Sequence, residues 1–204
     1  MLNRVAMRDN IAVIALLEFI ETGARLMAVN SHIFWDHHYR DVKIVQIGIL
    51  MEELERVAEQ FAKYPPKPIA ETAFNQGRPA PKYNPANKGT DIPLILCVDL
   101  NSLVDSSVYD YITKGEIAPD HEDFMNFTYG DITRRGLKHR LGLQSSASSF
   151  GELRLTNFTP TFTAAIDYIF YTPSALKVTS VLGDVDKPYL DKNVGFPNAH
   201  FPSE

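Results

Sequence analysis

One stretch of the sequence decides the fold: Leu94-Ile95-Leu96-Cys97-Val98-Asp99-Leu100-Asn101-Ser102. Its apolar part has the length of a buried strand, Pro93 precedes it, and an acid, an amide and a hydroxyl end it. We therefore expect Asp99 and Asn101 at the carboxyl end of a strand, where α/β sheets tend to place ligands. An extended backbone would put these two residues on one face, where a carboxylate can take a proton or hold a metal. The plainer alternative, that Asp99 only opens a turn, stays open at this point.

The composition limits the class of protein. The chain has 204 residues, of which 45% are hydrophobic and 22% are charged, which is typical of a globular protein with one sizeable core. A formal charge of −5 argues against a nucleic-acid binder that relies on bulk positive charge. The single cysteine, Cys97, excludes a disulfide within the chain and is expected in the core. No apolar run approaches the roughly 20 residues of a membrane span, so we expect a protein of the cytoplasm or nucleus.

Two patterns precede the central stretch. Apolar runs at 11–19 and 26–29 flank a turn that contains Gly23, which predicts a β-hairpin whose second strand ends in Asn30 and His32. The next residues, 33–40, form a loop dense in aromatic and histidine side chains. From Asp41, the expected N-cap, apolar residues recur every three or four positions until Tyr64-Pro65-Pro66, which predicts a long helix.

The remaining segments are expected to follow the chain in a simple order. A proline-rich insertion at 64–93 lacks periodicity and is expected to be a long loop. Asp105 should cap a short helix that ends near Gly115. The basic cluster at 134–140 is interpreted as a solvated surface loop. Two further strands are expected at 165–171 and 176–182.

The positions of the polar residues constrain the sheet. Asn30, His32, Asp99 and Asn101 lie at the carboxyl ends of their strands, whereas Asp167 lies near the amino end of its strand. If these groups meet at one site, the strand of Asp167 must run antiparallel to the other two. This disfavours a parallel dinucleotide-binding sheet and predicts a mixed or antiparallel sandwich.

Several motifs, in order along nearly the whole chain, carry a family resemblance. They are Val29-Asn30-Ser31-His32, Trp35-Asp36, Asp41-Val42-Lys43, Asp99-Leu100-Asn101-Ser102, Thr156-Asn157-Phe158-Thr159-Pro160, Ile166-Asp167-Tyr168-Ile169-Phe170 and Gly195-Phe196-Pro197. Together they resemble the exonuclease/endonuclease/phosphatase superfamily and, within it, the poly(A)-shortening nucleases of the CCR-NOT complex. The resemblance implies an α/β fold in which a two-sheet, mixed or antiparallel β-sandwich is flanked by helices. Residues 1–204 would then be a partial nuclease domain that includes the insertion at 64–93.

The resemblance also implies an activity and a set of residue roles. The activity is Mg²⁺-dependent hydrolysis that removes AMP from the 3′ end of poly(A), with CCR-NOT subunits as partners. Asp99 would be the base and a shared metal ligand, Asn101 its partner at the scissile phosphate, and His32 a phosphate ligand. Asp167 would orient a histidine. The residues assigned to substrate binding are Phe162, which would stack on an adenine, His37 opposite it, Asn30 and Trp35.

The sequence departs from the family pattern at defined positions. Val98 stands where the family has a glycine before the catalytic acid, and His37 stands where it has a proline. The resemblance places the main metal-binding glutamate before Met1 and the catalytic histidine after Glu204, so we expect the 204 residues alone to be inactive.

Two other interpretations of the function stay open, and a third is disfavoured. The chain is alternatively an inactive paralogue that acts as an RNA-binding or complex-interaction module, or a related phosphodiesterase or phosphatase. A zinc site from His32, His37 and His38 is disfavoured, because adjacent histidines point apart on an extended backbone.

Overall fold

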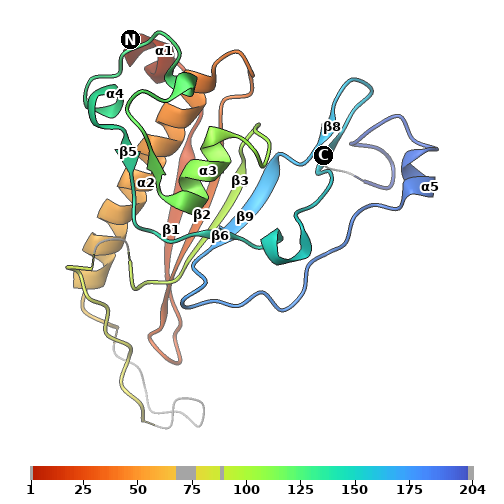
Figure 1. The fold of residues 1–204 in the computed structure, drawn as a ribbon. Coiled ribbons are helices and arrows are strands. Elements are labelled where there is room, and N and C mark those ends of the chain that lie inside the picture. Colours follow the sequence, from red (N-terminus) through yellow and green to blue (C-terminus); the bar gives the residue numbers. More distant parts are fainter. Residues whose placement is uncertain (1, 68–76, 88–89, 202–204) are drawn as a thin grey trace.

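A five-stranded mixed sheet forms the centre of the molecule (Figure 1). The computed structural model describes residues 2–67, 77–87 and 90–201. The sheet has the order β1-β2-β3-β9-β6. Its strands are β1 (Ala12–Glu18), β2 (Arg25–His32), β3 (Leu94–Asp99), β6 (Gln144–Ser145) and β9 (Asp167–Tyr171). Two ribbons accompany it, β4 (Glu116–Ile117) with β5 (Leu137–Lys138), and β7 (Asn157–Phe158) with β8 (Thr163–Ala164).

The strand directions agree with the expectation from the polar residues. Strands β1 and β2 form the predicted antiparallel hairpin. Strand β2 runs parallel to β3, whereas β9 runs antiparallel to β3 and pairs Asp167 directly with Asp99. The carboxyl ends of β2 and β3 and the amino end of β9 therefore meet at one edge of the sheet.

Helices cover one face of this sheet (Figure 1). They are α1 (Leu2–Ala6), α2 (Arg40–Lys63) and α3 (Ser107–Lys114), and the remaining short helices are η1 (Glu122–Phe124), α4 (Asp131–Arg135), η2 (Ser148–Phe150) and α5 (Lys187–Leu190). The core lies between the sheet and helices α2 and α3. Its fully buried members include Met27, Leu94, Leu96 and Phe170 from the strands and Ile44, Ile47, Met51, Leu54 and Ile112 from the helices.

The two predicted N-caps are each shifted by one or two residues. Helix α2 is capped by Tyr39, and Asp41 lies in its first turn, fully buried, where it accepts a hydrogen bond from Arg4 Nε at 2.7 Å and another from the hydroxyl of Tyr129. These partners draw Asp41 into the interior, away from the backbone N–H groups that a cap would bind. Helix α3 is capped by Ser106 instead of Asp105.

Among the described residues, the long helices pack on one face of the sheet, and the other face is more exposed (Figure 1). Along β3, Leu94, Leu96 and Val98 are buried, whereas the alternate side chains Ile95, Cys97 and Asp99 on this open face are only partly covered. The expectation that Cys97 is a core residue is therefore wrong, because it occupies the alternate side of the strand; partial burial still raises the pKa of its thiol. Within the described residues, the chain forms one large sheet of the expected sandwich, and β1 is an exposed edge with apolar side chains such as Val13 and Leu17.

Two segments differ from or extend the expectations. Residues 176–182 form no strand, and the expectation of one there is wrong; the strand next to β9 is β6, which pairs with Phe170 and Tyr171. Helix α5 was not predicted. The insertion at 64–93 contains neither helix nor strand in its described parts, while residues 68–76, 88–89 and 202–204 lie outside the described residues.

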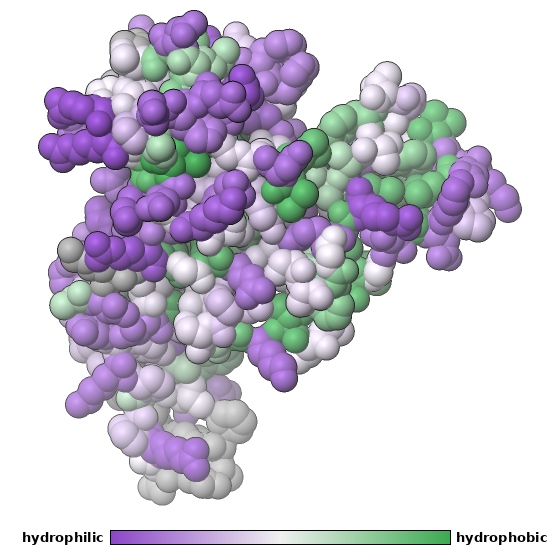
Figure 2. Space-filling view, in the orientation of Figure 1, coloured by the Kyte–Doolittle hydropathy of each residue, from purple (hydrophilic) through white to green (hydrophobic). Residues whose placement is uncertain are grey.

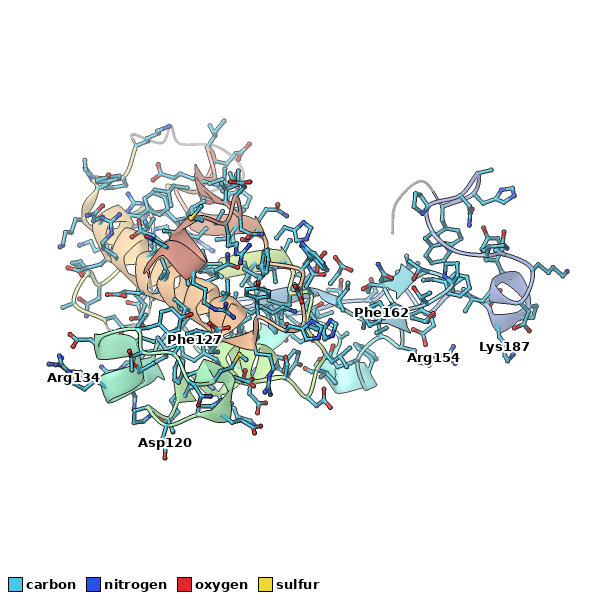
Figure 3. All side chains as sticks on the ribbon, turned by 90° about the horizontal axis from the view of Figure 1, so that it is seen from above. Asp120, Phe127, Arg134, Arg154, Phe162 and Lys187 are labelled. Atoms are coloured by element: carbon cyan, nitrogen blue, oxygen red, sulfur yellow. The ribbon has the colours of Figure 1, made fainter. Side chains whose placement is uncertain are left out.

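The C-terminal part projects from the main body as an arm, which we define as residues 155–164 and 183–201 (Figures 1 and 3). Phe196 N donates to Phe158 O at 2.7 Å, and the two rings pack edge to face, so the two segments of the arm are held together. Figure 2 shows hydrophobic residues gathered on this arm; the exposed ones include Phe162 and Val194. No helix among the described residues is long and apolar enough to cross a membrane.

Candidate active site

Three of the predicted catalytic residues form a row across the open face of the sheet. In the pairing of the strands, His32 lies opposite Asp99, and Asp99 lies opposite Asp167. All three line a groove of about 650 Å³, together with Asn30 and Cys97. The row exists because β2 and β3 end, and β9 begins, at the same edge. The sequence prediction of convergence at this edge agrees with the geometry.

Asn101 lies beside the row, but a turn places it there and not the extended backbone that was expected. It does not continue the strand: β3 ends at Asp99, and Asn101 has a φ of 45°, in the left-handed region that asparagine tolerates. Its backbone N–H donates to Asp99 Oδ1 at 2.7 Å. Asp99 therefore opens a turn, as the plainer alternative held, and the same turn carries Asn101 toward the row.

The side chain of Asn101 links two neighbouring segments. Its Nδ2 donates to Ile33 O at 3.0 Å and lies 2.9 Å from His32 Nε2. His32 Nε2 also lies 3.3 Å from Asp99 Oδ2. When His32 Nε2 carries no proton, it can accept a hydrogen bond from Asn101. When Nε2 carries a proton, it can donate to Asp99 instead, so the proton on this nitrogen selects the partner.

Asp167 is oriented by a residue that the sequence prediction did not single out. Thr156 Oγ1 donates to Asp167 Oδ2 at 2.6 Å and accepts from the backbone N–H groups of Ile166 and Asp167 at 3.0 and 3.1 Å. This one hydroxyl fixes both the start of β9 and the direction of the carboxylate. The motif Thr156-Asn157-Phe158-Thr159-Pro160 contains this residue, but the resemblance gave it no role.

A second, smaller pocket of about 260 Å³ adjoins the row. Asn101, His37 and Phe162 line it, so the pair assigned to base stacking shares one pocket. Phe162 is 46% exposed and lies where the arm joins the main body (Figure 3). Arg40 also lines the pocket, and its Nη1 lies 2.6 Å from Asp123 Oδ1.

Lys43 is the main site residue that sequence reasoning missed. Although it lies on the buried face of α2, it carries a charge, and its Nζ donates to Asn101 O at 2.5 Å. Burial lowers the pKa of Lys43, an effect opposed by the carboxylates of Asp36 and Asp99. The available signal was the motif Asp41-Val42-Lys43, which carried the family resemblance but gave Lys43 no role.

The last two predicted substrate residues lie at different distances from this centre. Asn30 lines the groove, and its Nδ2 is 3.4 Å from Cys97 O. Trp35 is 68% exposed and lines neither the groove nor the smaller pocket. The structure thus brings together seven of the eight predicted residues, namely Asn30, His32, His37, Asp99, Asn101, Phe162 and Asp167, and leaves Trp35 aside.

The groove offers hard oxygen ligands for a metal, but too few to fill its coordination shell. Asp99 and Asp167 supply carboxylates. Within the described ranges, the one group of three histidine or acidic ligands that are close enough to hold an ion is Asp36, His37 and His38, outside the row. The row therefore suits a hard cation that completes its shell with other oxygen ligands.

Comparison with known proteins gives full-length matches to this chain. It is 52% identical over 204 residues to the CCR4-Not complex 3′-5′-exoribonuclease subunit Ccr4 of Mycosarcoma maydis, and 46% identical over 205 residues to that of Schizosaccharomyces pombe. Each match includes 100% of this chain, which spans 30% and 29% of the two relatives. No protein-family model matches the chain.

Solved structures share the fold at low sequence identity. The catalytic domain of human Nocturnin, solved with a bound sulfate anion, matches with a TM-score of 0.50 and 18% identity over 83% of this chain and 44% of its own. ANGEL2, a 2′,3′-cyclic phosphatase, matches with a TM-score of 0.54 and 19% identity over 81% of this chain and 50% of its own. At such identity the likeness concerns the fold alone.

Proposed function

Because this chain is a homologue of part of the fungal Ccr4 subunits, as its motifs predicted, we propose that it forms the substrate-binding side of a 3′-5′ exoribonuclease that shortens poly(A). The observation that carries the proposal is the row of His32, Asp99 and Asp167 beside the pocket of Phe162 and His37. A scissile phosphate at the row would leave the terminal base within reach of the pocket.

The row has the groups that phosphodiester hydrolysis requires. Attack on phosphorus needs a positioned water and stabilisation of the charge that develops on oxygen. In the proposed mechanism, Asp99 orients the water and takes its proton, while the Asn101 amide and His32 donate hydrogen bonds to phosphate oxygens. Asp167, held by Thr156, presents its carboxylate at the same edge. The backbone N–H of Asn101 already fixes one oxygen of Asp99, which leaves Oδ2 turned toward the row.

Mg²⁺ is the proposed cofactor. The fit rests on the chemistry of the donors: carboxylate oxygens at an open edge suit a hard cation that completes its shell with water and phosphate. Asp99 would hold it together with the substrate, and it would neutralise charge on the phosphate. We expect Asp99 to be a shared ligand and not to bind the ion tightly by itself.

The smaller pocket supplies the proposed preference for adenine. Phe162 offers an exposed ring, and His37 lines the same pocket. Base stacking on an aromatic side chain contributes about 1 to 3 kcal/mol per base. Further expected partners are the subunits of the CCR-NOT complex, and the expected compartments are the cytoplasm and the nucleus.

The experiment uses a chimera, because the chain spans 30% of its relative. The matched segment of the M. maydis subunit is replaced by this chain, and release of AMP from a labelled poly(A) oligomer is followed with Mg²⁺ and with EDTA. We expect trimming that needs Mg²⁺ and is lost in Asp99→Asn. Asp120→Asn is the matched control, since Asp120 is exposed and lies away from the row (Figure 3).

Three results would contradict the proposal. Trimming at the normal rate in Asp99→Asn would remove the row from the chemistry. A folded chimera that binds poly(A) but releases no AMP would support the alternative of an RNA-binding module, and equal rates on poly(A) and poly(U) would favour a general phosphodiesterase.

A further inference from the structure

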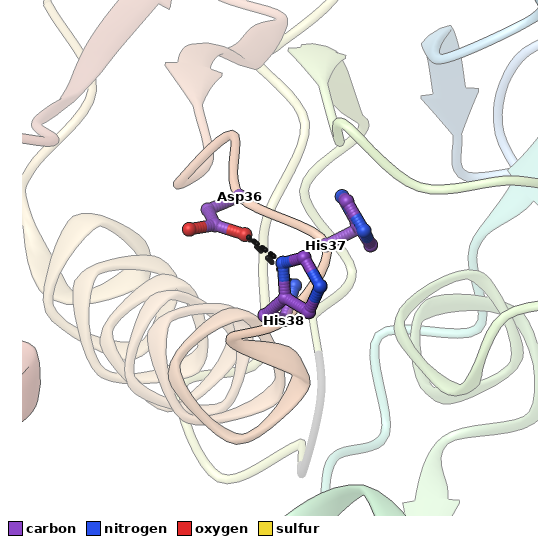
Figure 4. A group of neighbouring side chains, drawn as sticks. All are labelled: Asp36, His37 and His38. Carbon is purple, nitrogen blue, oxygen red and sulfur yellow. Dashed lines mark hydrogen bonds and ion pairs between the residues drawn. The ribbon is translucent and has the colours of Figure 1, made fainter.

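The loop between β2 and α2 brings Asp36, His37 and His38 together (Figure 4). The loop turns here: Tyr39 N donates to Asp36 O at 3.1 Å, and His38 N donates to Asp36 Oδ1 at 2.9 Å. The expectation that adjacent histidines point apart is wrong for this reason, and their ring centroids lie 3.8 Å from each other. We propose that Asp36, His37 and His38 form a zinc site that is separate from the Mg²⁺ site of the row.

His38 is oriented as a metal ligand needs to be. Its Nδ1 lies 3.1 Å from Asp36 Oδ1, the contact drawn as a dashed line in Figure 4. This distance is close to that between neighbouring ligands of one zinc ion, so His38 Nδ1 and Asp36 Oδ1 could bind the ion in place of the proton that they share.

The distances suit closure around one ion. One ligand atom from each of the three side chains lies within 4.8 Å of the others. In a tetrahedral zinc site with bonds near 2.0 to 2.1 Å, neighbouring ligands are about 3.4 Å apart. Both imidazoles are exposed, so rotation of their side chains can make up the difference. Water would fill the fourth position. Two imidazoles favour zinc over Mg²⁺, which prefers oxygen ligands.

The two neighbouring cations are both engaged by groups other than the proposed ligands. Arg40 pairs with Asp123, and the ammonium of Lys43 binds Asn101 O. His32, which the sequence interpretation grouped with these histidines, contacts Asp99 and Asn101 instead. The proposed zinc ligands are therefore three consecutive residues of one loop.

The site has a consequence for RNA binding, and this step rests on the proposed function. His37 also lines the pocket of Phe162. An imidazole that holds zinc cannot at the same time stack freely on a nucleobase, so zinc should compete with poly(A) for this side chain.

The zinc site itself is tested without RNA, by calorimetric titration of the 204-residue chain with ZnCl₂. We expect one ion per chain, with affinity at least about tenfold weaker in His38→Gln and His37→Gln, and about 10- to 100-fold weaker in Asp36→Asn. His200→Gln is the matched control, since His200 is an exposed histidine far along the chain. Binding should also weaken in mildly acidic buffer, because protonated imidazoles cannot bind zinc. Thermal melts establish that each variant is folded.

Affinity in His38→Gln equal to that of the unchanged chain, or no saturable binding at all, would overturn the proposal. The competition is tested separately, by fluorescence anisotropy of a labelled poly(A) oligomer with the chimera. We expect zinc to weaken binding several-fold in the unchanged chimera and to have no effect in His38→Gln. A zinc effect that persists in His38→Gln would refute the competition, while the calorimetry would still decide the site. Failure of the proposed nuclease activity would leave the calorimetric result unaffected.

Discussion

Replacing Asn101 by alanine and by glycine separates the contribution of its side-chain hydrogen bonds from the cost of its left-handed backbone conformation. Both changes remove the hydrogen bonds from Nδ2 to Ile33 O and His32 Nε2. At about 0.5 to 1.5 kcal/mol each, their loss should lower the free energy of unfolding by about 1 to 3 kcal/mol in either variant. Because φ is 45°, alanine adds about 1 to 2 kcal/mol of left-handed strain. Glycine adds none, but it gains about 0.4 to 1 kcal/mol of entropy in the unfolded chain.

With the middle of each range, the net expectation is that Asn101→Gly is more stable than Asn101→Ala by about 0.8 kcal/mol. Urea unfolding of the 204-residue chain measures this difference. In the chimera, both variants should lose turnover on poly(A) to the same degree, by about 100-fold or more, while RNA affinity changes little. Equal stability of the two variants would refute the turn geometry, and a glycine variant with near-normal turnover would refute the role of the amide.

Three further outcomes are expected. Phe162→Ala should weaken binding of poly(A) by about 1 to 3 kcal/mol and narrow the preference for A over U in filter-binding assays, whereas Phe150→Ala, on another exposed ring, should change neither. Lys43→Met should lower turnover through Asn101, while the free energy of unfolding at neutral pH changes by less than about 1 kcal/mol, because the lost hydrogen bond is offset by relief of a buried charge. Since burial lowers the pKa of Lys43 in the folded state, the free energy of unfolding of the unchanged chain should rise relative to that of Lys43→Met as pH approaches the ordinary value of 10.5, a difference that urea unfolding of both chains measures. Arg25→Met should cost about 3 to 5 kcal/mol in urea unfolding, because the buried guanidinium binds two carbonyls at the end of α2 and Glu18.

The features that sequence reasoning found are those that depend on local pattern and strand direction. The hairpin, the long helix and the strands at 94–99 and 167–171 follow from alternation and helical spacing, which the core preserves. The antiparallel direction of β9 followed from the position of Asp167 at the amino end of its strand, because only that direction brings it to Asp99.

The features it missed depend on hydrogen bonds between distant segments. The turn at Asn101 is held by Lys43, and the carboxylate of Asp167 is held by Thr156. The strand expected at 176–182 from its composition does not form, and the residues that pair with β9 on that side come from β6, at Gln144 and Ser145. The stacked rings of His37 and His38 arise from a turn that closes on the Asp36 side chain. None of these partners is visible from spacing alone.

The register of three strands assembles the row, and the core specifies that register. Alternate residues of a strand face opposite sides of the sheet, so a slip of one residue would place Val98 or Tyr168 in the row and turn its carboxylates toward the helices. Burying an ionised carboxylate without a partner costs several kcal/mol, so such a slip is strongly disfavoured. Packing on the other face of the sheet also opposes such a slip, because fully buried side chains of the strands contact α2 and α3 there. These side chains are Met27, Leu94, Leu96 and Phe170. The apolar pattern of one face therefore determines which polar groups meet on the other, and the chemistry proposed for the row depends on the core that it does not touch.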